Sequence, residues 1–320
     1  MHCKIAALLI ASLLLSLSGC KKWRDVDYLV IDLSAGPSAE SYPVSHLEDV
    51  PEGGWPDEYK TTKLVLRRIP AGEFMMGSPT NEVLRSQYET YHHVKLTTDF
   101  YLGVFEVTQR QYELVTGRNP SDKKGPANPV ESVSYSILRG RDLGSRWPAS
   151  AAVDPDTFIG RLRTRTGLSG LDLPTEAQWE FACRAGTETP FSNGAILASS
   201  SDIYPKVEAI ATICRYKFNP ESGDRSVAVG SFEPNSFGLY DMHGNVWEWC
   251  LDWWAKSPEE SVDPVGPAAG QYRVRRGGSF YDTPRVCRSS WRNPCYYYDA
   301  PSWSNNTTGF RLCLSVRDDK

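Results

Sequence analysis

Cysteine thiols are the most chemically versatile side chains in this 320-residue chain. Beyond Cys20 the chain holds six of them, between Cys183 and Cys313. A thiolate is a nucleophile and a ligand for soft metals, whereas a buried cysteine behaves as a small apolar side chain. For Cys287 we favour a disulfide partner or a buried side chain over a reactive thiol, because an oxidising compartment would let these cysteines pair with one another.

A second candidate site is the acidic turn between Asp241 and Glu248. Hard cations such as Ca²⁺ prefer oxygen ligands, and two carboxylates in a glycine-bent loop can supply them together with backbone carbonyls. The alternative is a metal-free turn in which Asp241 caps backbone amides and the neighbouring tryptophans fill the core. We favour calcium because both acidic positions are present. His243 lies inside this turn, where we expect it to be exposed.

The N-terminus has the features of an export signal. Lys4 precedes an apolar run over residues 5–17, which is too short to cross a bilayer as a helix and fits a signal peptide. The run leads to Cys20 in a sequence that resembles a bacterial lipobox. We predict that residues 1–19 are a lipoprotein signal peptide and that Cys20 is lipidated, with an ordinary secretory signal as the alternative. The acyl chains would then anchor the protein at the bacterial cell envelope.

The sequence after Cys20 favours one membrane over the other. By resemblance to lipoprotein sorting rules, an aspartate directly after this cysteine would indicate the inner membrane, and lysines stand there instead. We therefore expect the outer membrane, with the domain facing the periplasm or the exterior.

Composition bounds the class of protein. The chain is 40% hydrophobic with a net charge of -4, and no cluster of Lys and Arg stands out. We therefore expect a folded domain with a sizeable core and no nucleic-acid partner. The 10 Trp, 16 Tyr and 11 Phe, together with many Gly and Pro, indicate a loop-rich domain with an aromatic core.

Short strands and a few helices are expected to position these residues. The strand-like runs are 63–67, 72–76, 94–97 and 100–105. The helical segments are 109–115, 157–163 and 177–184. Thr108 and Thr175 are the expected N-caps of the first and third helices, and Gly117 ends the first. For the second helix, Asp154 or Asp156 is the expected cap.

We expect three parts along the chain. Residues 1–19 form the signal peptide, residues 20–60 a lipidated tether and N-terminal extension, and residues 61–317 one domain. A β-type run at residues 28–33 is expected to add an edge strand or to stay mobile. Residues 138–155 are expected to form a surface loop.

Seven motifs occur in one order along the chain. They are residues 69–78, 106–109, 128–131, 173–180, 238–249, 276–279 and 309–311. The series resembles that of the formylglycine-generating enzymes, also called sulfatase-modifying factors, and extends from Ile69 to Val316. The resemblance implies an α+β fold, a loop-rich variant of the C-type lectin fold with short antiparallel strands and a few helices.

The resemblance also implies a calcium ligand set. It consists of the side chains of Asp241 and Glu248 and the carbonyls of Gly244 and Val246. It further implies a bond from Cys183 to the last strand, although Cys313 lies one place beyond the family position.

The family's oxidases hold copper between two cysteines five positions apart, and here those positions are Asp282 and Cys287. Soft thiolates select Cu(I), and a carboxylate is a hard ligand that cannot replace a thiolate in a two-coordinate site. Copper binding and the oxidase mechanism are therefore in doubt. We predict a non-catalytic or altered binding module at the cell envelope, with a groove near Trp247, Arg276 and Ser279.

The ligand of this groove is expected to be a peptide, a protein or a glycan. Tyr296, Tyr297, Tyr298 and Trp303 would lie beside the groove and stack on such a ligand, or pack in the core instead. The alternative function is a sulfatase-maturation-type oxidase that uses Cys287 with Asp282 in a modified site.

Overall fold

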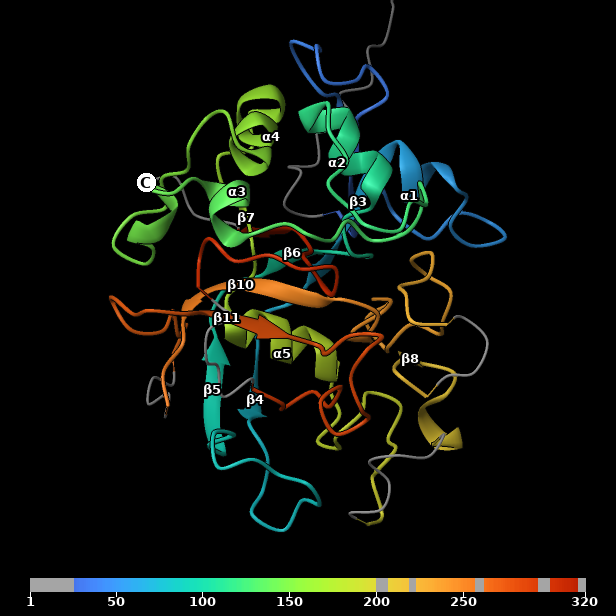
Figure 1. Ribbon diagram of the computed structural model, residues 1–320, viewed down its shortest axis with the longest axis vertical. Coiled ribbons are helices and arrows are strands. Elements are labelled where there is room, and N and C mark those ends of the chain that lie inside the picture. The colour runs from blue at the N-terminus through green and yellow to red at the C-terminus, as the bar shows by residue number, and fades with distance from the viewer. Residues whose placement is uncertain (1–25, 200–206, 219–222, 257–261, 293–299, 316–320) are drawn as a thin grey trace, which may run out of the picture.

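The structure is a computed structural model that describes residues 26–199, 207–218, 223–256, 262–292 and 300–315. The predicted signal peptide, Cys20, Cys295 and the tyrosines at 296–298 lie outside these residues. Helices α1 to α4 lie together in the upper part of Figure 1, and strands β10 and β11 cross its middle with α5 beside them. None of the helices in the described ranges is long and apolar enough to span a bilayer.

A six-stranded sheet organises the upper part of the molecule. Its order is β2-β1-β3-β6-β13-β7, and every neighbouring pair is antiparallel. The strands are β1 (Tyr28–Asp32), β2 (Val44–Leu47), β3 (Lys63–Ile69), β6 (Phe100–Gly103), β7 (Leu171–Asp172) and β13 (Cys313–Ser315). Chain segments from both ends of the sequence therefore meet in one sheet.

The domain begins earlier than the sequence suggested. Strand β1 lies between β2 and β3, and Leu29 and Ile31 are at most 1% exposed. The run at residues 28–33 is thus an internal strand rather than an edge strand or a mobile one. Of the predicted tether and N-terminal extension over residues 20–60, the described part from residue 26 is a folded extension whose apolar side chains complete the core.

The two faces of the sheet bury different elements. Side chains alternate along β6, so Tyr101 belongs to one apolar cluster and Phe100 and Leu102 to another. The first cluster includes residues of α2 (Gln109–Thr116), α3 (Tyr135–Arg139) and α4 (Phe158–Thr166). The second includes residues of α5 (Glu176–Arg184) and of the hairpin β4 (Gly72–Met76) and β5 (His92–Leu96). A further short helix, α1 (Glu58–Thr61), precedes β3.

The predicted helix boundaries are largely confirmed. Thr108 and Thr175 each form a capping box, and Gly117 ends α2 with φ of 76°. The cap of α4 is Thr157, whose hydroxyl accepts from Gly160 N, and not Asp154 or Asp156.

The segment at residues 138–155 is more than a surface loop. Arg139 is fully buried and its guanidinium binds the Asp172 carboxylate at 2.7 and 2.9 Å. Trp147 is 6% exposed and packs in the first cluster. The insertion therefore contributes to the core, and the prediction is corrected there.

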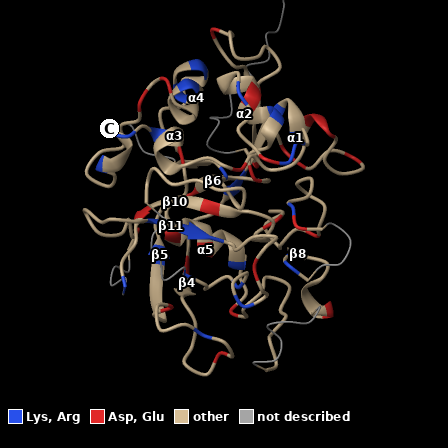
Figure 2. Cartoon of the chain, in the orientation of Figure 1, with Lys and Arg blue, Asp and Glu red and all other residues tan. Residues whose placement is uncertain are grey.

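A three-stranded sheet carries the motifs of the C-terminal half. It has the order β11-β10-β12, with β10 (Trp247–Trp253), β11 (Arg273–Arg276) and β12 (Thr308–Gly309). Figure 2 shows an acidic position on β10 beside basic positions on β11. Strands β8 (Cys214–Arg215) and β9 (His243–Gly244) precede β10 in the sequence and form a separate parallel pair.

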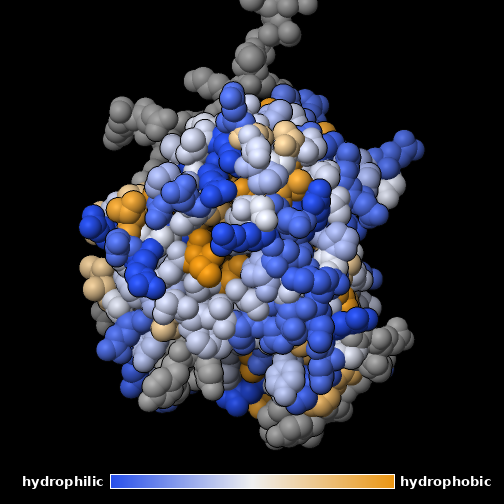
Figure 3. All heavy atoms as spheres, turned by 45° about the horizontal axis from the view of Figure 1, so that its top comes forward, coloured by the Kyte–Doolittle hydropathy of each residue, from blue (hydrophilic) through white to orange (hydrophobic). Residues whose placement is uncertain are grey.

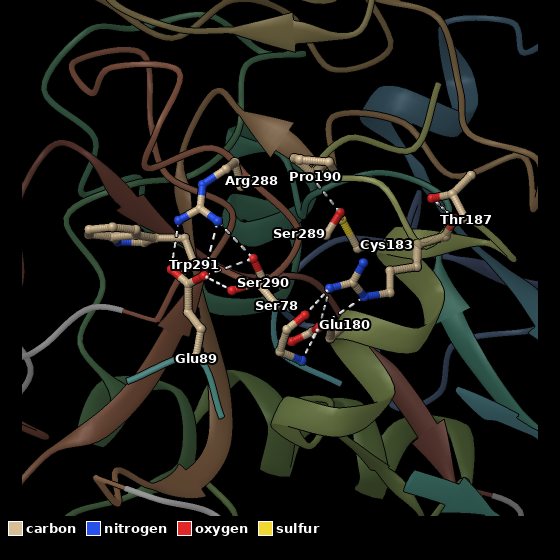
Figure 4. A network of polar contacts seen from close by, with 12 residues as sticks. Ser78, Glu89, Glu180, Cys183, Thr187, Pro190, Arg288, Ser289, Ser290 and Trp291 are labelled. Carbon is tan, nitrogen blue, oxygen red and sulfur yellow. Dashed lines mark hydrogen bonds and ion pairs between the residues drawn. The ribbon is translucent and has the colours of Figure 1, made fainter. Parts of the chain in front are cut away.

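Arginines are unusually frequent in the core. Those at most 1% exposed are Arg139, Arg215, Arg273, Arg276, Arg288 and Arg311. Most lie against carboxylates, as Figure 4 shows for Arg288 and Glu89, whose Nη2 and Oε1 are 2.6 Å apart. Breaking one of these buried pairs would leave an uncompensated charge, so the pairs fix the geometry of the segments that they join.

The surface is mainly hydrophilic in Figure 3, with a small hydrophobic patch on the face shown.

Candidate functional site: an aromatic groove with a carboxylate at its floor

A groove of about 580 Å³ opens beside β10 and β11. Aromatic, amide, hydroxyl and charged side chains line it: Asp224, Trp247, Arg275, Ser279, Phe280, Tyr281, Asp282, Val286, Trp291, Trp303, Asn305, Asn306 and Thr307. Its volume and its mix of aromatic faces with a few polar groups are typical of ligand pockets.

The turn that follows β11 places Asp282 at the groove. Its Oδ2 accepts a hydrogen bond of 2.9 Å from Trp247 Nε1 and one of 2.5 Å from Ser279 Oγ. Burial raises the pKa of the Asp282 carboxyl above its ordinary value, while the bonds from Ser279 and Trp247 act in the opposite direction. Three of the predicted site residues therefore meet, and the carboxylate is held in place by the other two.

Arg275, and not Arg276, faces the groove. Successive side chains of a strand point to opposite faces, so only one of these two neighbours on β11 can reach it. Arg276 is fully buried and bonds to Glu180 in α5. The Arg275 guanidinium lies 5.2 Å from the centre of the Trp247 ring and 5.1 Å from that of Trp303. The prediction that placed Arg276 at the groove is thus corrected.

Cys287 does not line the groove. It is fully buried in a separate apolar cluster with Phe191, Ile213 and Cys214. Its neighbour Val286 forms part of the groove wall in its place. The five described cysteines from 183 onward are all unbonded in this structure, so Cys183 is not bonded to Cys313.

The predicted calcium turn contains two different carboxylates. Asp241 Oδ2 accepts from Gly230 N, whereas the buried Oδ1 has no hydrogen-bond partner. Burial raises the pKa of Asp241 to about 6. Glu248 is engaged on both oxygens, with Arg311 at 2.6 Å on each and with Trp179 Nε1 at 2.7 Å.

The unpartnered Asp241 oxygen fits a cation ligand. A bound Ca²⁺ would supply the positive partner that this carboxylate lacks. Glu248 of the predicted ligand set already has such a partner in Arg311, so the carbonyls of Gly244 and Val246 would have to complete the coordination. Within the described ranges no three His, Cys, Asp or Glu side chains form a cluster suited to a metal ion, so carbonyls would have to supply much of such a site.

Glu106 contacts this turn from a distant part of the chain, and sequence reasoning missed it. Its Oε1 accepts from Val246 N and its Oε2 from Asn245 Nδ2. Burial and the nearby Asp241 carboxylate raise the pKa of Glu106 well above its usual range. Only its place in the second of the seven motifs could have drawn attention to it.

His243 is buried rather than exposed. Its Nδ1 lies 2.8 Å from the Cys287 carbonyl and therefore donates, and its Nε2 accepts from Ser192 N at 3.1 Å. Burial lowers its pKa to about 4. The imidazole is neutral at pH 7 and serves as a structural link between the turn and the segment of Cys287.

The fold and site define a class of protein. A loop-rich α+β domain with a sheet, few helices and a groove behind a Gly-Gly-Ser turn matches the formylglycine-generating-enzyme variant of the C-type lectin fold. Residues 56–316 match the model of the "Sulfatase-modifying factor enzyme 1-like domain". The chain belongs to this family.

Several known proteins are similar to it. A formylglycine-generating enzyme of Mus musculus is 38% identical over 284 residues, which cover 77% of this chain and 71% of that enzyme. Among solved structures, PvdO from Pseudomonas aeruginosa is 26% identical with a TM-score of 0.63, covering 79% of this chain and 94% of PvdO. Treponema denticola variable protein 1 is 25% identical with a TM-score of 0.61, covering 79% and 95%.

Proposed function

We propose that this chain is a non-catalytic binding member of its family, which presents the aromatic groove to a peptide, protein or glycan at the bacterial cell envelope. One observation carries the proposal. The groove holds the carboxylate of Asp282, fixed by Trp247 and Ser279, and the single remaining family cysteine is fully buried outside it. The described lining residues include no thiol, and so neither the nucleophile nor the soft ligand that the oxidase chemistry needs.

The groove has the chemistry of a recognition site. Trp247, Trp291, Trp303 and Tyr281 line it, and Tyr281 is 55% exposed. Aromatic faces stack on sugar rings and on apolar side chains, and nearby amide and hydroxyl groups fix orientation through hydrogen bonds. Such a surface suits a ligand that is extended and partly polar.

Copper binding tests the loss of oxidase chemistry. We expect the mature chain, titrated with Cu(I) against a competing chelator, to bind no more metal than its Cys287→Ala variant. The Cys250→Ala variant is the matched control, because Cys250 is also fully buried but belongs to a different apolar cluster from Cys287. Tight Cu(I) binding that is lost in Cys287→Ala and kept in Cys250→Ala would overturn the proposal in favour of the modified oxidase site.

Ligand arrays test the groove itself. The mature chain is to be applied to peptide and glycan arrays alongside Tyr281→Ala and Trp303→Ala, which remove groove aromatics. Tyr91→Ala is the control, since Tyr91 is 40% exposed and lies outside the groove lining. Loss of a stacking aromatic weakens binding by roughly tenfold or more, at about 1–3 kcal/mol per stacked ring. Binding that both groove variants retain would refute this use of the groove.

The envelope location is a separate part of the proposal. Lipidation at Cys20 would place the domain on the membrane surface by its acyl chains alone. Expression with a radiolabelled or clickable fatty acid should label the wild type and not Cys20→Ser, and the label should fractionate with the outer membrane.

A further inference from the structure

The cluster behind the groove brings two cysteines from distant parts of the chain together. Cys214 and Cys287 are both fully buried in the same apolar cluster. The Cys214 thiol is the first cause of the raised pKa of the Cys287 thiol, so the two thiols are close neighbours. The other described sulfurs have different neighbours: Cys183 contacts Ser289 Oγ, and Cys313 contacts Gln178 Oε1.

Backbone contacts hold the two segments in this register. Cys214 pairs with His243 between β8 and β9, and the ring of His243 donates to the Cys287 carbonyl at 2.8 Å. Three residues after Cys214, Lys217 N donates to the Asp282 carbonyl at 2.9 Å. Several main-chain contacts therefore hold the two cysteines near each other.

We propose that Cys214 and Cys287 form a disulfide bond in the mature protein under oxidising conditions. The bond would tie β8 to the segment that begins at the groove wall with Val286. It would close a loop of roughly 70 residues and so restrict the unfolded chain. The bond would lie behind the wall of the groove and would form whether or not the groove binds a ligand.

The chemistry is a two-electron exchange. One cysteine, as its thiolate, attacks a small-molecule or protein disulfide and releases one thiol of that oxidant. The second thiolate then attacks the resulting mixed disulfide and releases the other thiol. The two cysteines lose two protons and two electrons, and the oxidant's disulfide bond becomes two thiols.

The surroundings indicate when this exchange takes place. The hydrogen bond with Cys214 and burial raise the pKa of the Cys287 thiol well above its usual range, and the Arg215 guanidinium acts in the opposite direction. A buried, protonated thiol reacts slowly, so the bond forms during folding while the segments are still accessible. Once closed, it is shielded from reductants by the same burial.

Peptide mapping tests the bond directly. The mature chain is refolded in a glutathione redox buffer, its free thiols are alkylated in denaturant, and it is digested with trypsin without reduction. The expected product joins residues 207–215 to residues 286–288. Alkylated Cys214 and Cys287, or a link from either of them to another cysteine, would overturn the proposal.

Thermal stability supplies a second measurement. The oxidised wild type should unfold roughly 5–10 °C above the same chain kept in reductant. This difference should vanish in Cys214→Ala and persist in Cys250→Ala, which removes a buried thiol from a different apolar cluster. Equal melting temperatures for the oxidised and reduced wild type would contradict the bond.

Discussion

At the scale of single residues, Asp282 stands where the resemblance to the family's oxidases implies a cysteine. A thiolate there could share a Cu(I) ion with a second thiolate, whereas a carboxylate accepts hydrogen bonds from Trp247 and Ser279. Asp282 is therefore a fixed hydrogen-bond acceptor in the lining of the groove. Cys287 meanwhile turns into the cluster behind it.

Asp252 offers a test of how burial sets the charge of individual carboxyls. It is 4% exposed and accepts a hydrogen bond from Glu176 N. Burial raises its pKa from an ordinary value of 3.8 to about 7. Between these values the unfolded chain releases this proton and the folded chain keeps it, so the group's contribution to stability is full below pH 3.8 and is lost as pH rises through about 7.

Between pH 4 and 7, the free energy of unfolding should fall by on the order of 4 kcal/mol because of Asp252 alone. Urea unfolding at a series of pH values should show a flatter profile for Asp252→Asn than for the wild type, because the amide keeps an acceptor and does not titrate. Parallel profiles for the two proteins would contradict the raised pKa.

At the scale of elements, backbone geometry decides where the site residues lie. Gly244 in β9 has φ of 86°, and a Cβ there would lie 1.9 Å from the Arg215 carbonyl oxygen of β8. Only glycine lets the two strands approach this closely. The close approach in turn sets the distance between the acidic turn and the cysteine cluster.

Gly244→Ala should therefore lower the free energy of unfolding by about 3 kcal/mol or more, since both the positive φ and the overlap oppose it. Gly186→Ala is the matched control: its φ is 91°, but nothing lies within 4 Å of the added Cβ. We expect a cost of about 1 kcal/mol there. Equal costs in chemical denaturation would show that β8 and β9 do not pack as described.

Local signals predicted the elements well and their partners poorly. The capping boxes at Thr108 and Thr175 are encoded within four residues, so α2 and α5 could be located from sequence alone. The place of β1 inside the sheet depends on pairing with β3, which no local pattern reveals. The side of β11 that faces the groove likewise depends on how the sheet packs, and Arg275 was missed for that reason.

The site residues were likewise predicted only in part. The resemblance placed Trp247, Ser279 and Asp282 in one site, and in the structure hydrogen bonds join Asp282 to the other two. Cys214 and Cys287 share no motif, so their proximity could not be predicted from the sequence.

At the scale of the whole molecule, buried charges join the segments of this loop-rich domain. Arg311 near the C-terminus binds Glu248 of β10, and Arg288 binds Glu82 and Glu89 after the first hairpin strand. With few helices and short strands, such pairs fix the loops relative to one another. A cation at Asp241 would extend this scheme to the one carboxylate of the acidic turn that has an unpartnered oxygen.

Calcium removal should therefore lower the melting temperature of the mature domain. A ligand that binds only the native state at one hundred times its Kd adds about 2.7 kcal/mol, or roughly 5–10 °C for a domain of this size. Chelation by EGTA should produce this shift in the wild type and in Asp224→Asn, but not in Asp241→Asn. A wild-type melting temperature that EGTA leaves unchanged would refute the calcium site.

The most direct test of the central claim is a turnover assay. The mature chain, supplied with Cu(I) and oxygen, is incubated with a peptide that carries one cysteine, and mass spectrometry follows conversion of that cysteine to formylglycine. The binding function predicts no conversion above the level of Cys287→Ser. Conversion by the wild type that Cys287→Ser abolishes would contradict it and establish an oxidase.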